Sequence, residues 1–273
     1  MHKDTLKGNK TIVTKGMNKN MNIEIAKQEF INFTQKYDLT FPKMKRKFGH
    51  SFRVMEHSYN IAKTLQLDEK EIEIARLIGL IHDIGHFEQI KIQDILKENR
   101  IIDHGDLGVE ILVQNNYLRK FIEESEYDRI ILKAIKNHNK FKIEEELTEK
   151  ELLFSKIVRD ADKLDIFYEG AEMFWTDAKQ VEEVNNSTIS ADVMEYVIKN
   201  IYWDKKDIKT EADDIIRFIS STFDINFKYD FEVMKRENYI NKILDKFDFK
   251  DKTTAKQMKK IRKIINEYVE NKA

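Results

Sequence analysis

The sequence contains no cysteine, a single proline and only 8 glycines among its 273 residues. Average usage would give about 14 prolines and about 19 glycines in a chain of this length. The lack of cysteine excludes a disulfide framework, a thiolate metal site and a thiol nucleophile. The scarcity of proline and glycine leaves too few turn formers for a β-sandwich, barrel or propeller. We therefore expect an all-α protein, in which histidines and carboxylates must hold any metal.

An excess of one charge and a long apolar run are also lacking. Lysine and arginine total 48 and aspartate and glutamate 49, so the formal net charge is -1 and any basic site must be local. No apolar run is long enough to span a bilayer. Residues 1–22 are rich in lysine and asparagine and lack the apolar segment of a secretion signal. We expect a cytoplasmic protein with no membrane partner, no stable nucleic-acid partner and a disordered N-terminal arm over 1–22.

Apolar residues recur at helical spacing along most of the remaining chain. Asp68 with Glu71, and Thr148 with Glu151, have the spacing of helix capping boxes, and Pro42 predicts a turn. No linker rich in glycine, serine or proline divides the chain, so we predict a helical bundle over 23–170 with a helical C-terminal extension, 171–273, packed on it. The predicted helices lie at about 23–37, 49–65, 68–85, 105–115, 127–138, 148–167, 173–175, 193–201, 215–223 and 254–269.

The pair His82-Asp83 follows the most apolar of these predicted helices. Two ionisable groups in such a segment would be costly to bury unpaired. Neighbouring helix positions differ by about 100° around the axis, so a divalent metal is one reason for both side chains to turn toward one point. The alternative is a buried histidine and aspartate that hydrogen-bond to each other.

The pair belongs to an ordered set of motifs. His50 lies upstream in Gly49-His50-Ser51-Phe52-Arg53-Val54, and Asp160-Ala161-Asp162-Lys163-Leu164-Asp165 lies downstream. This order resembles the HD superfamily of metal-dependent phosphohydrolases, over about residues 23–170. The tail through Ile264 is also similar to extended clostridial-type HD-domain proteins, in the strings 224–229 and 239–243.

The resemblance implies four metal ligands, His50, His82, Asp83 and a late aspartate. Asp160, Asp162 and Asp165 are all candidates for the late aspartate. Matching Ala161-Asp162-Lys163-Leu164 to the family motif favours Asp162. Asp160 and Asp165 would then support the ligands from behind or face solvent.

Two further histidines bear on the number of ions. His104 and His138 fall between the pair and the late aspartate, where two-metal members of the superfamily carry additional histidines. The resemblance then implies two divalent ions, with Asp83 bridging between His50, His82 and Asp162 on one ion and His104 and His138 on the other. Such a donor set suits manganese, iron, cobalt or zinc. The alternative is that His104 begins a helix and His138 ends one.

Asp83, His86 and Lys163 are the predicted catalytic residues. His86 stands where related two-metal enzymes carry lysine or arginine, and it could contact a substrate phosphate or protonate a leaving oxygen. Lys163 adjoins Asp162 and could contact the same phosphate. A surface histidine at a helix end is the alternative for His86.

Other features admit both a functional and a structural interpretation. A run of basic residues around Lys45 could attract an anionic ligand or form a solvated face. A set of aromatic residues after Asp165 could form the wall of a nucleobase pocket or belong to the core. His57 is interpreted as a packing or surface histidine. The basic residues are Lys43, Lys45, Arg46, Lys47 and Arg53, and the aromatic residues are Phe167, Tyr168, Phe174 and Trp175.

The sequence thus predicts a phosphohydrolase that uses a metal-activated water to cleave a nucleotide or another small phosphate ester. One rival is a di-iron oxygenase of the HD type, because its ligands would also be histidine and aspartate. Another is a metal-stabilised interaction module whose helical tail recruits a partner.

Overall fold

The computed structural model describes residues 22–99 and 101–273, and the regular elements in these ranges are all helical. The predicted all-α fold is therefore confirmed. The disordered arm predicted for residues 1–22 lies, apart from Asn22, outside the described residues. Among the helices described, none has the length and apolar character that crossing a membrane requires.

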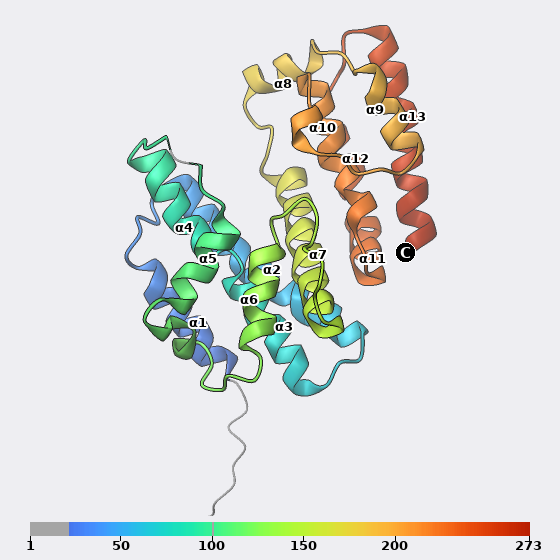
Figure 1. The fold of residues 1–273 in the computed structure, drawn as a ribbon. Helices are drawn as coiled ribbons and strands as arrows, with labels where there is room; N and C mark the ends of the chain where they lie inside the picture. Colours follow the sequence, from blue (N-terminus) through green and yellow to red (C-terminus); the bar gives the residue numbers. More distant parts are fainter. Residues whose placement is uncertain (1–21, 100) are drawn as a thin grey trace, which may run out of the picture.

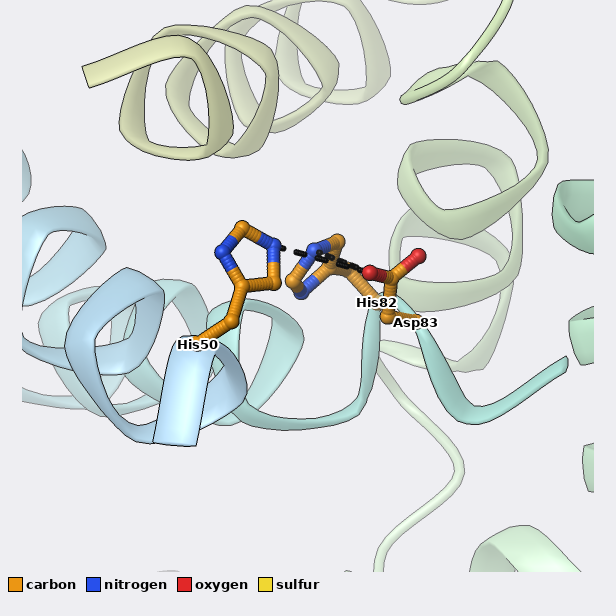
Figure 2. Close-up of side chains that lie close together, drawn as sticks. All are labelled: His50, His82 and Asp83. Carbon is orange, nitrogen blue, oxygen red and sulfur yellow. Dashed lines mark ion pairs between the residues drawn. The ribbon is translucent and has the colours of Figure 1, made fainter. Parts of the chain in front are cut away.

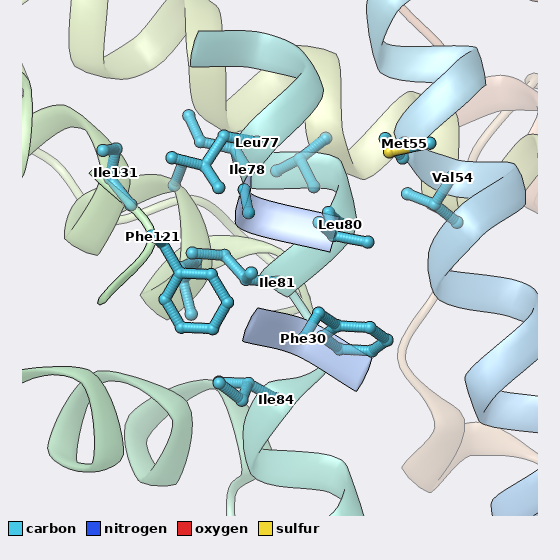
Figure 3. Packing of buried hydrophobic residues seen from close by; sticks show 14 of the residues in the cluster. Phe30, Val54, Met55, Leu77, Ile78, Leu80, Ile81, Ile84, Phe121 and Ile131 are labelled. Atoms are coloured by element: carbon cyan, nitrogen blue, oxygen red, sulfur yellow. The ribbon is translucent and has the colours of Figure 1, made fainter. Parts of the chain in front are cut away.

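The first part of the chain forms a bundle in which α2 packs along α3 and α7, α6 packs on α7, and α4 packs on α5 (Figure 1). Buried side chains such as Phe30, Leu80 and Ile81 fill the space between these helices (Figure 3). The helices are α1 (Ile23–Thr34), α2 (Pro42–Thr64), α3 (Glu69–Ile81), α4 (Ile84–Ile90), α5 (His104–Val113), α6 (Asp128–Asn137) and α7 (Glu149–Glu172).

Local capping chemistry sets several of these helix starts. The Asp68 side chain accepts a hydrogen bond from the Glu71 backbone, and Thr148 and Glu151 form a capping box, as predicted. A turn precedes Pro42, as predicted, but Pro42 itself occupies the first turn of α2, which begins seven residues before the predicted start. Proline is tolerated there because its missing N–H would have no partner in the helix. The basic run therefore lies on α2.

The second part of the chain forms a further set of helices (Figure 1). These helices pack around a second buried cluster. A helix over 173–175 was predicted, but this segment is a turn after the end of α7, and Trp175 has a φ of 53°. Sequence reasoning missed α8, α11 and α12. The helices are α8 (Ala178–Asn185), α9 (Ala191–Ile198), α10 (Glu211–Ser220), α11 (Lys228–Glu237), α12 (Tyr239–Leu244) and α13 (Lys252–Lys272).

Helix α7 is shared by both parts of the molecule. Its residue Phe154 belongs to the first buried cluster and Phe167 to the second. Tyr168 and Trp175 pack against the second cluster, and Phe174 stacks edge-on against Trp175. Phe167 therefore belongs to the core, whereas the other three aromatic residues are half-buried, and a nucleobase contact stays a prediction. The limits 23–170 and 171–273 stay a prediction, and residue 170 lies in the last turn of α7.

Candidate metal centre

The pair His82-Asp83 lies at a break between two helices. His82 follows the last residue of α3, and Asp83, with φ -96° and ψ 17°, precedes α4. The break turns both side chains toward one point, where they meet His50 from α2 (Figure 2). A continuous helix would have pointed these neighbours about 100° apart.

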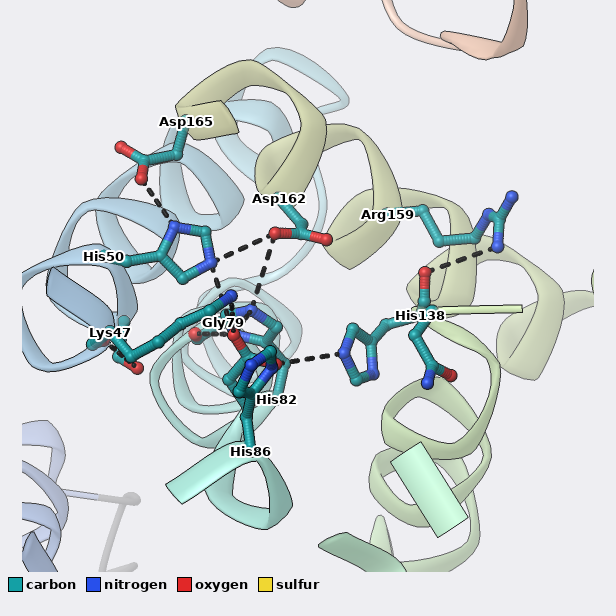
Figure 4. Close-up of polar contacts among 12 residues, drawn as sticks. Lys47, His50, Gly79, His82, His86, His138, Arg159, Asp162 and Asp165 are labelled. Carbon is teal, nitrogen blue, oxygen red and sulfur yellow. Dashed lines mark hydrogen bonds and ion pairs between the residues drawn. The ribbon is translucent and has the colours of Figure 1, made fainter. Parts of the chain in front are cut away.

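One oxygen of Asp83 faces the first half of the cluster. Asp83 Oδ2 lies 3.5 Å from Nε2 of His50 and 3.5 Å from Nε2 of His82. Asp162, from the middle of α7, places its Oδ1 3.1 Å from His50 Nε2 and 3.7 Å from His82 Nε2. Two imidazole nitrogens and two carboxylate oxygens thus converge; Figure 2 shows Asp83 beside the two histidines, and Figure 4 shows Asp162.

The other oxygen of Asp83 faces the second half. Asp83 Oδ1 lies 3.3 Å from His138 Nε2, 3.4 Å from His104 Nε2 and 3.5 Å from His86 Nδ1. The Nε2 atoms of His104 and His138 are 3.1 Å apart. His104 does begin α5 and His138 does follow α6, but their rings meet at Asp83. All six predicted ligands therefore lie in one cluster, and His86 joins them.

Backbone carbonyl groups orient two of these imidazoles. His82 Nδ1 lies 2.8 Å from the Gly79 carbonyl oxygen, and His138 Nδ1 lies 2.6 Å from that of Ile135. A carbonyl oxygen only accepts hydrogen bonds, so each Nδ1 carries the proton. Each Nε2 then presents its lone pair to the cluster, as a metal ligand requires.

A carboxylate orients the third imidazole. Asp165 Oδ2 lies 2.6 Å from His50 Nδ1, and Arg53 binds the same carboxylate through Nε at 2.6 Å and Nη2 at 2.9 Å. From the sequence, Asp165 was expected either to support a metal ligand from behind or to face solvent. The side chain is buried behind His50, in the arrangement that commonly supports metal-binding histidines.

The residues present fit divalent metal ions. His50 Nε2, His82 Nε2 and His86 Nδ1 are buried and have no hydrogen-bond partner. A buried polar atom without a partner is costly, and a bound cation would supply that partner. Imidazole with carboxylate is a donor set that manganese, iron, cobalt and zinc accept.

Electrostatics keep Asp83 and Asp162 ionised. Burial opposes the charge on Asp83, but the Lys47 ammonium, 2.6 Å from Oδ2, and the neighbouring histidines hold its pKa well below the usual range. Burial likewise opposes the charge on Asp162, and the neighbouring His50 and His82 side chains hold its pKa well below the usual range. Both carboxylates are therefore available as anionic ligands at neutral pH.

The histidines differ in protonation. Burial lowers the pKa of His82 and His86, and it lowers that of His104 to about 2, so these imidazoles are neutral. Burial and Lys47 also act against the charge on His50, but the adjacent carboxylates of Asp162 and Asp165 raise its pKa to about 9. A cation that binds His50 must therefore displace a proton.

The basic run on α2 divides between the surface and the centre. Lys43 pairs with Asp94 at 2.7 Å on the surface and Lys45 is exposed, as expected of a solvated face. Arg46 pairs with the buried Glu169. Lys47 instead reaches into the cluster and binds Asp83, and the attraction of an anionic ligand stays a prediction.

Two residues near Asp162 belong to the junction between the two parts of the chain. Lys163 Nζ lies 2.7 Å from Asp224 Oδ2 and donates to the Asp224 carbonyl oxygen at 3.1 Å. This ammonium is therefore engaged outside the cluster. The predicted contact of Lys163 with a substrate phosphate stays a prediction. Asp160 is buried and accepts hydrogen bonds from the backbone of Asn226 at 2.6 Å and Phe227 at 3.0 Å. His57 packs near the Tyr229 ring, as interpreted.

Fold and site define an all-α protein with a buried histidine and aspartate cluster suited to divalent cations. Residues 48–166 match the family model of the HD domain, a range that includes all six predicted ligands. This part of the chain belongs to the HD superfamily, whose members are in general metal-dependent phosphohydrolases. Neither the curated proteins nor the solved structures include a match to the chain.

Proposed function

We propose that this protein is a phosphohydrolase that cleaves a small phosphate ester, such as a nucleotide, with a water activated at the His/Asp cluster. The observation that carries the proposal is the position of Asp83, whose Oδ2 faces His50 and His82 while its Oδ1 faces His104 and His138. A carboxylate with its oxygens directed at two sets of imidazoles suits a bridge between two ions.

The first ion would be held by His50, His82, Asp83 and Asp162, and the second by Asp83, His104 and His138. Two divalent ions at such a site acidify a water molecule and neutralise the oxygens of a phosphoryl group. Asp165 keeps the His50 ring aimed at the first position. Manganese, iron, cobalt and zinc are the candidates for both positions.

Exposure indicates the side from which the substrate enters. The side chains of His50 and His82 are completely buried, whereas those of His86, His104 and Asp162 are 22%, 19% and 16% exposed. The substrate therefore approaches from the side of the cluster on which His86, His104 and Asp162 lie. His86 is neutral there and can donate one hydrogen bond to a phosphate oxygen or use its free Nδ1 toward the ion.

The decisive experiment combines metal analysis with a substrate panel. We expect purified protein to hold two ions and to release phosphate from a member of a panel of nucleotides, cyclic dinucleotides and phosphomonoesters, equally well without oxygen. Failure with every phosphate ester, together with dioxygen consumption by the di-iron protein on a hydroxylated or phosphonate substrate, would replace the proposal with the oxygenase alternative.

His138→Ala tests the count of two ions. The change removes a ligand of the second position only, so bound metal should fall to about half that of the unaltered protein. His57→Gln is the matched control, because His57 lies on α2 outside the cluster. A stoichiometry of one in the unaltered protein under saturating manganese would reject the two-ion site.

A further inference from the structure

Lys47 is a buried cation inside the candidate metal centre. It lies on α2 one turn before His50, its side chain is only 10% exposed, and its ammonium is 2.6 Å from Asp83 Oδ2. That oxygen is also the one that the unpaired nitrogens of His50 and His82 face. A cation here repels any metal ion bound beside it, so a purely structural role would be better served by an apolar side chain.

The other cations around the cluster already have acidic partners outside it. In the described part of the chain, Arg46 pairs with Glu169 and Arg53 with Asp165. Arg159 and Lys163 likewise share Asp224. Lys47 differs from these four because its carboxylate partner is itself a proposed metal ligand.

We propose that Lys47 binds the phosphate of the substrate and selects a terminal phosphomonoester over a phosphodiester, an inference that rests on the proposed phosphohydrolase function. If Asp83 served as a metal ligand, the Lys47 ammonium would need another anion, because a buried charge without a partner is costly. A phosphate oxygen at the centre supplies that anion. Lysine is a compact point charge on a flexible stem, so it can turn from Asp83 to this oxygen.

The charge of the ligand gives the selectivity. A terminal phosphate carries a charge between about -1.5 and -2 at neutral pH, whereas a diester carries a single negative charge. The added positive charge of Lys47 favours the more highly charged anion, and partial burial strengthens this preference because the local dielectric constant is low. Lys47 should therefore contribute more to monoester than to diester recognition.

Orthophosphate binding tests the role of Lys47 without turnover. In calorimetric titrations of manganese-loaded protein, Lys47→Met should weaken orthophosphate binding at least tenfold while two ions remain bound. Lys43→Met is the matched control, because Lys43 lies on the same helix and pairs with Asp94 at the surface. Lys47→Arg keeps the charge, so its orthophosphate affinity should lie between those of Lys47→Met and the unaltered protein. If Lys47→Met does not fold, Lys47→Arg is the variant to compare with the unaltered protein.

Hydrolysis supplies the second measurement. The kcat/KM for p-nitrophenyl phosphate should fall in Lys47→Met at least tenfold more than that for bis(p-nitrophenyl) phosphate. Unchanged orthophosphate affinity, equal losses on the two esters, or loss of the metal itself would each overturn the assignment of Lys47. If orthophosphate binding depends on Lys47 but the protein hydrolyses no ester, Lys47 keeps its role in phosphate binding and the phosphohydrolase function is rejected.

Discussion

Asp83 is the residue on which both halves of the candidate centre depend. Each of its oxygens faces a different set of imidazoles, and Lys47 holds it ionised in the metal-free protein. His50 and Asp162, by comparison, serve one half only. The loss of the Asp83 charge should therefore be felt at both metal positions.

Asp83→Asn keeps the shape of the side chain and removes its charge, so we expect bound metal to fall nearly to zero while helical content is retained. Metal analysis after loading and dialysis measures the first quantity, and circular dichroism the second. Asp94→Asn, which alters a surface partner of Lys43, should leave metal content unchanged. Normal metal content and turnover in Asp83→Asn would mean that the site is wrongly assigned.

Asp165 acts on the centre through the His50 ring. Asp165→Asn weakens the contact that orients this ring, and we expect metal affinity to fall about 10- to 100-fold, the usual effect of losing such a partner. Calorimetric titration with manganese measures the change. Glu56→Gln, at a surface carboxylate that pairs with Arg76, is the control. An unaltered affinity in Asp165→Asn would limit Asp165 to a packing role.

At the scale of the elements, helix ends bring the ligands together. His82 and Asp83 lie between α3 and α4, His104 begins α5, and His138 follows α6. At a helix end the backbone changes direction, so side chains close in sequence can converge on one point. His50 and Asp162, in contrast, lie within α2 and α7, and their positions depend on the packing of those long helices.

Gly85 lets α4 approach α5 closely enough to place His104. A Cβ at Gly85 would lie 2.2 Å from the His104 carbonyl oxygen and 2.5 Å from the Gly108 backbone nitrogen, and neither backbone atom can move aside cheaply. Gly85→Ala should lower the free energy of unfolding by about 1–3 kcal/mol, the usual cost of overpacking. It should also reduce bound metal toward one ion per chain, because His104 is displaced.

Thermal unfolding and metal analysis measure both effects of Gly85→Ala. Gly49→Ala is a matched control beside another ligand, because a Cβ at Gly49 would meet only the tip of the Arg53 side chain, at 3.1 Å. Equal stability and equal metal content in the two variants would contradict the role of this close approach.

At the scale of the whole molecule, two buried aspartates lie at the junction between α7 and α11. Backbone and side-chain N–H groups of the segment before α11 satisfy Asp160. Both oxygens of Asp230 are buried without a hydrogen-bond partner, and burial together with the charge of Asp160 raises the pKa of Asp230 well above its usual range. Folding therefore favours the protonated form of Asp230.

This pKa shift makes stability depend on pH. Above the ordinary pKa of 3.8, the unfolded chain has released a proton that the folded protein still binds at Asp230. The stability contributed by this group therefore falls as pH rises from that value toward the raised pKa. Asp230→Asn is permanently neutral, so its melting temperature should exceed that of the unaltered protein at pH 8, by a margin that shrinks toward pH 4.

Thermal unfolding between pH 4 and pH 8 measures the effect of Asp230→Asn. Glu232→Gln changes an exposed carboxylate on the same helix, paired with Lys228 at 3.1 Å, and should leave the pH profile unaltered. A difference between Asp230→Asn and the unaltered protein that is constant with pH would contradict the assigned protonation.

Local signals in the sequence sufficed for the helical class and for part of the site. The shortage of proline and glycine, the apolar spacing and the capping residues Asp68 and Thr148 each act within a few residues of the chain, so they can be interpreted without a fold. The ordered motifs likewise identified six side chains that the fold brings into one cluster. The six-residue helix α12 was missed because it spans too few turns to establish a helical period.

The remaining features depend on distances that no local pattern contains. Asp165 lies 115 positions from the His50 ring that it orients, and Lys163 lies 61 positions from Asp224, which holds its ammonium outside the cluster. In the sequence, Lys47 is one residue of a basic run that could be a solvated face. In the structure, α2 begins at Pro42 and directs the Lys47 side chain at Asp83. The sequence by itself determined which chemical groups the centre could use. Only the packing of α2, α4, α5 and α6 against α7 decided which of them meet, because burial and partner choice depend on the whole chain.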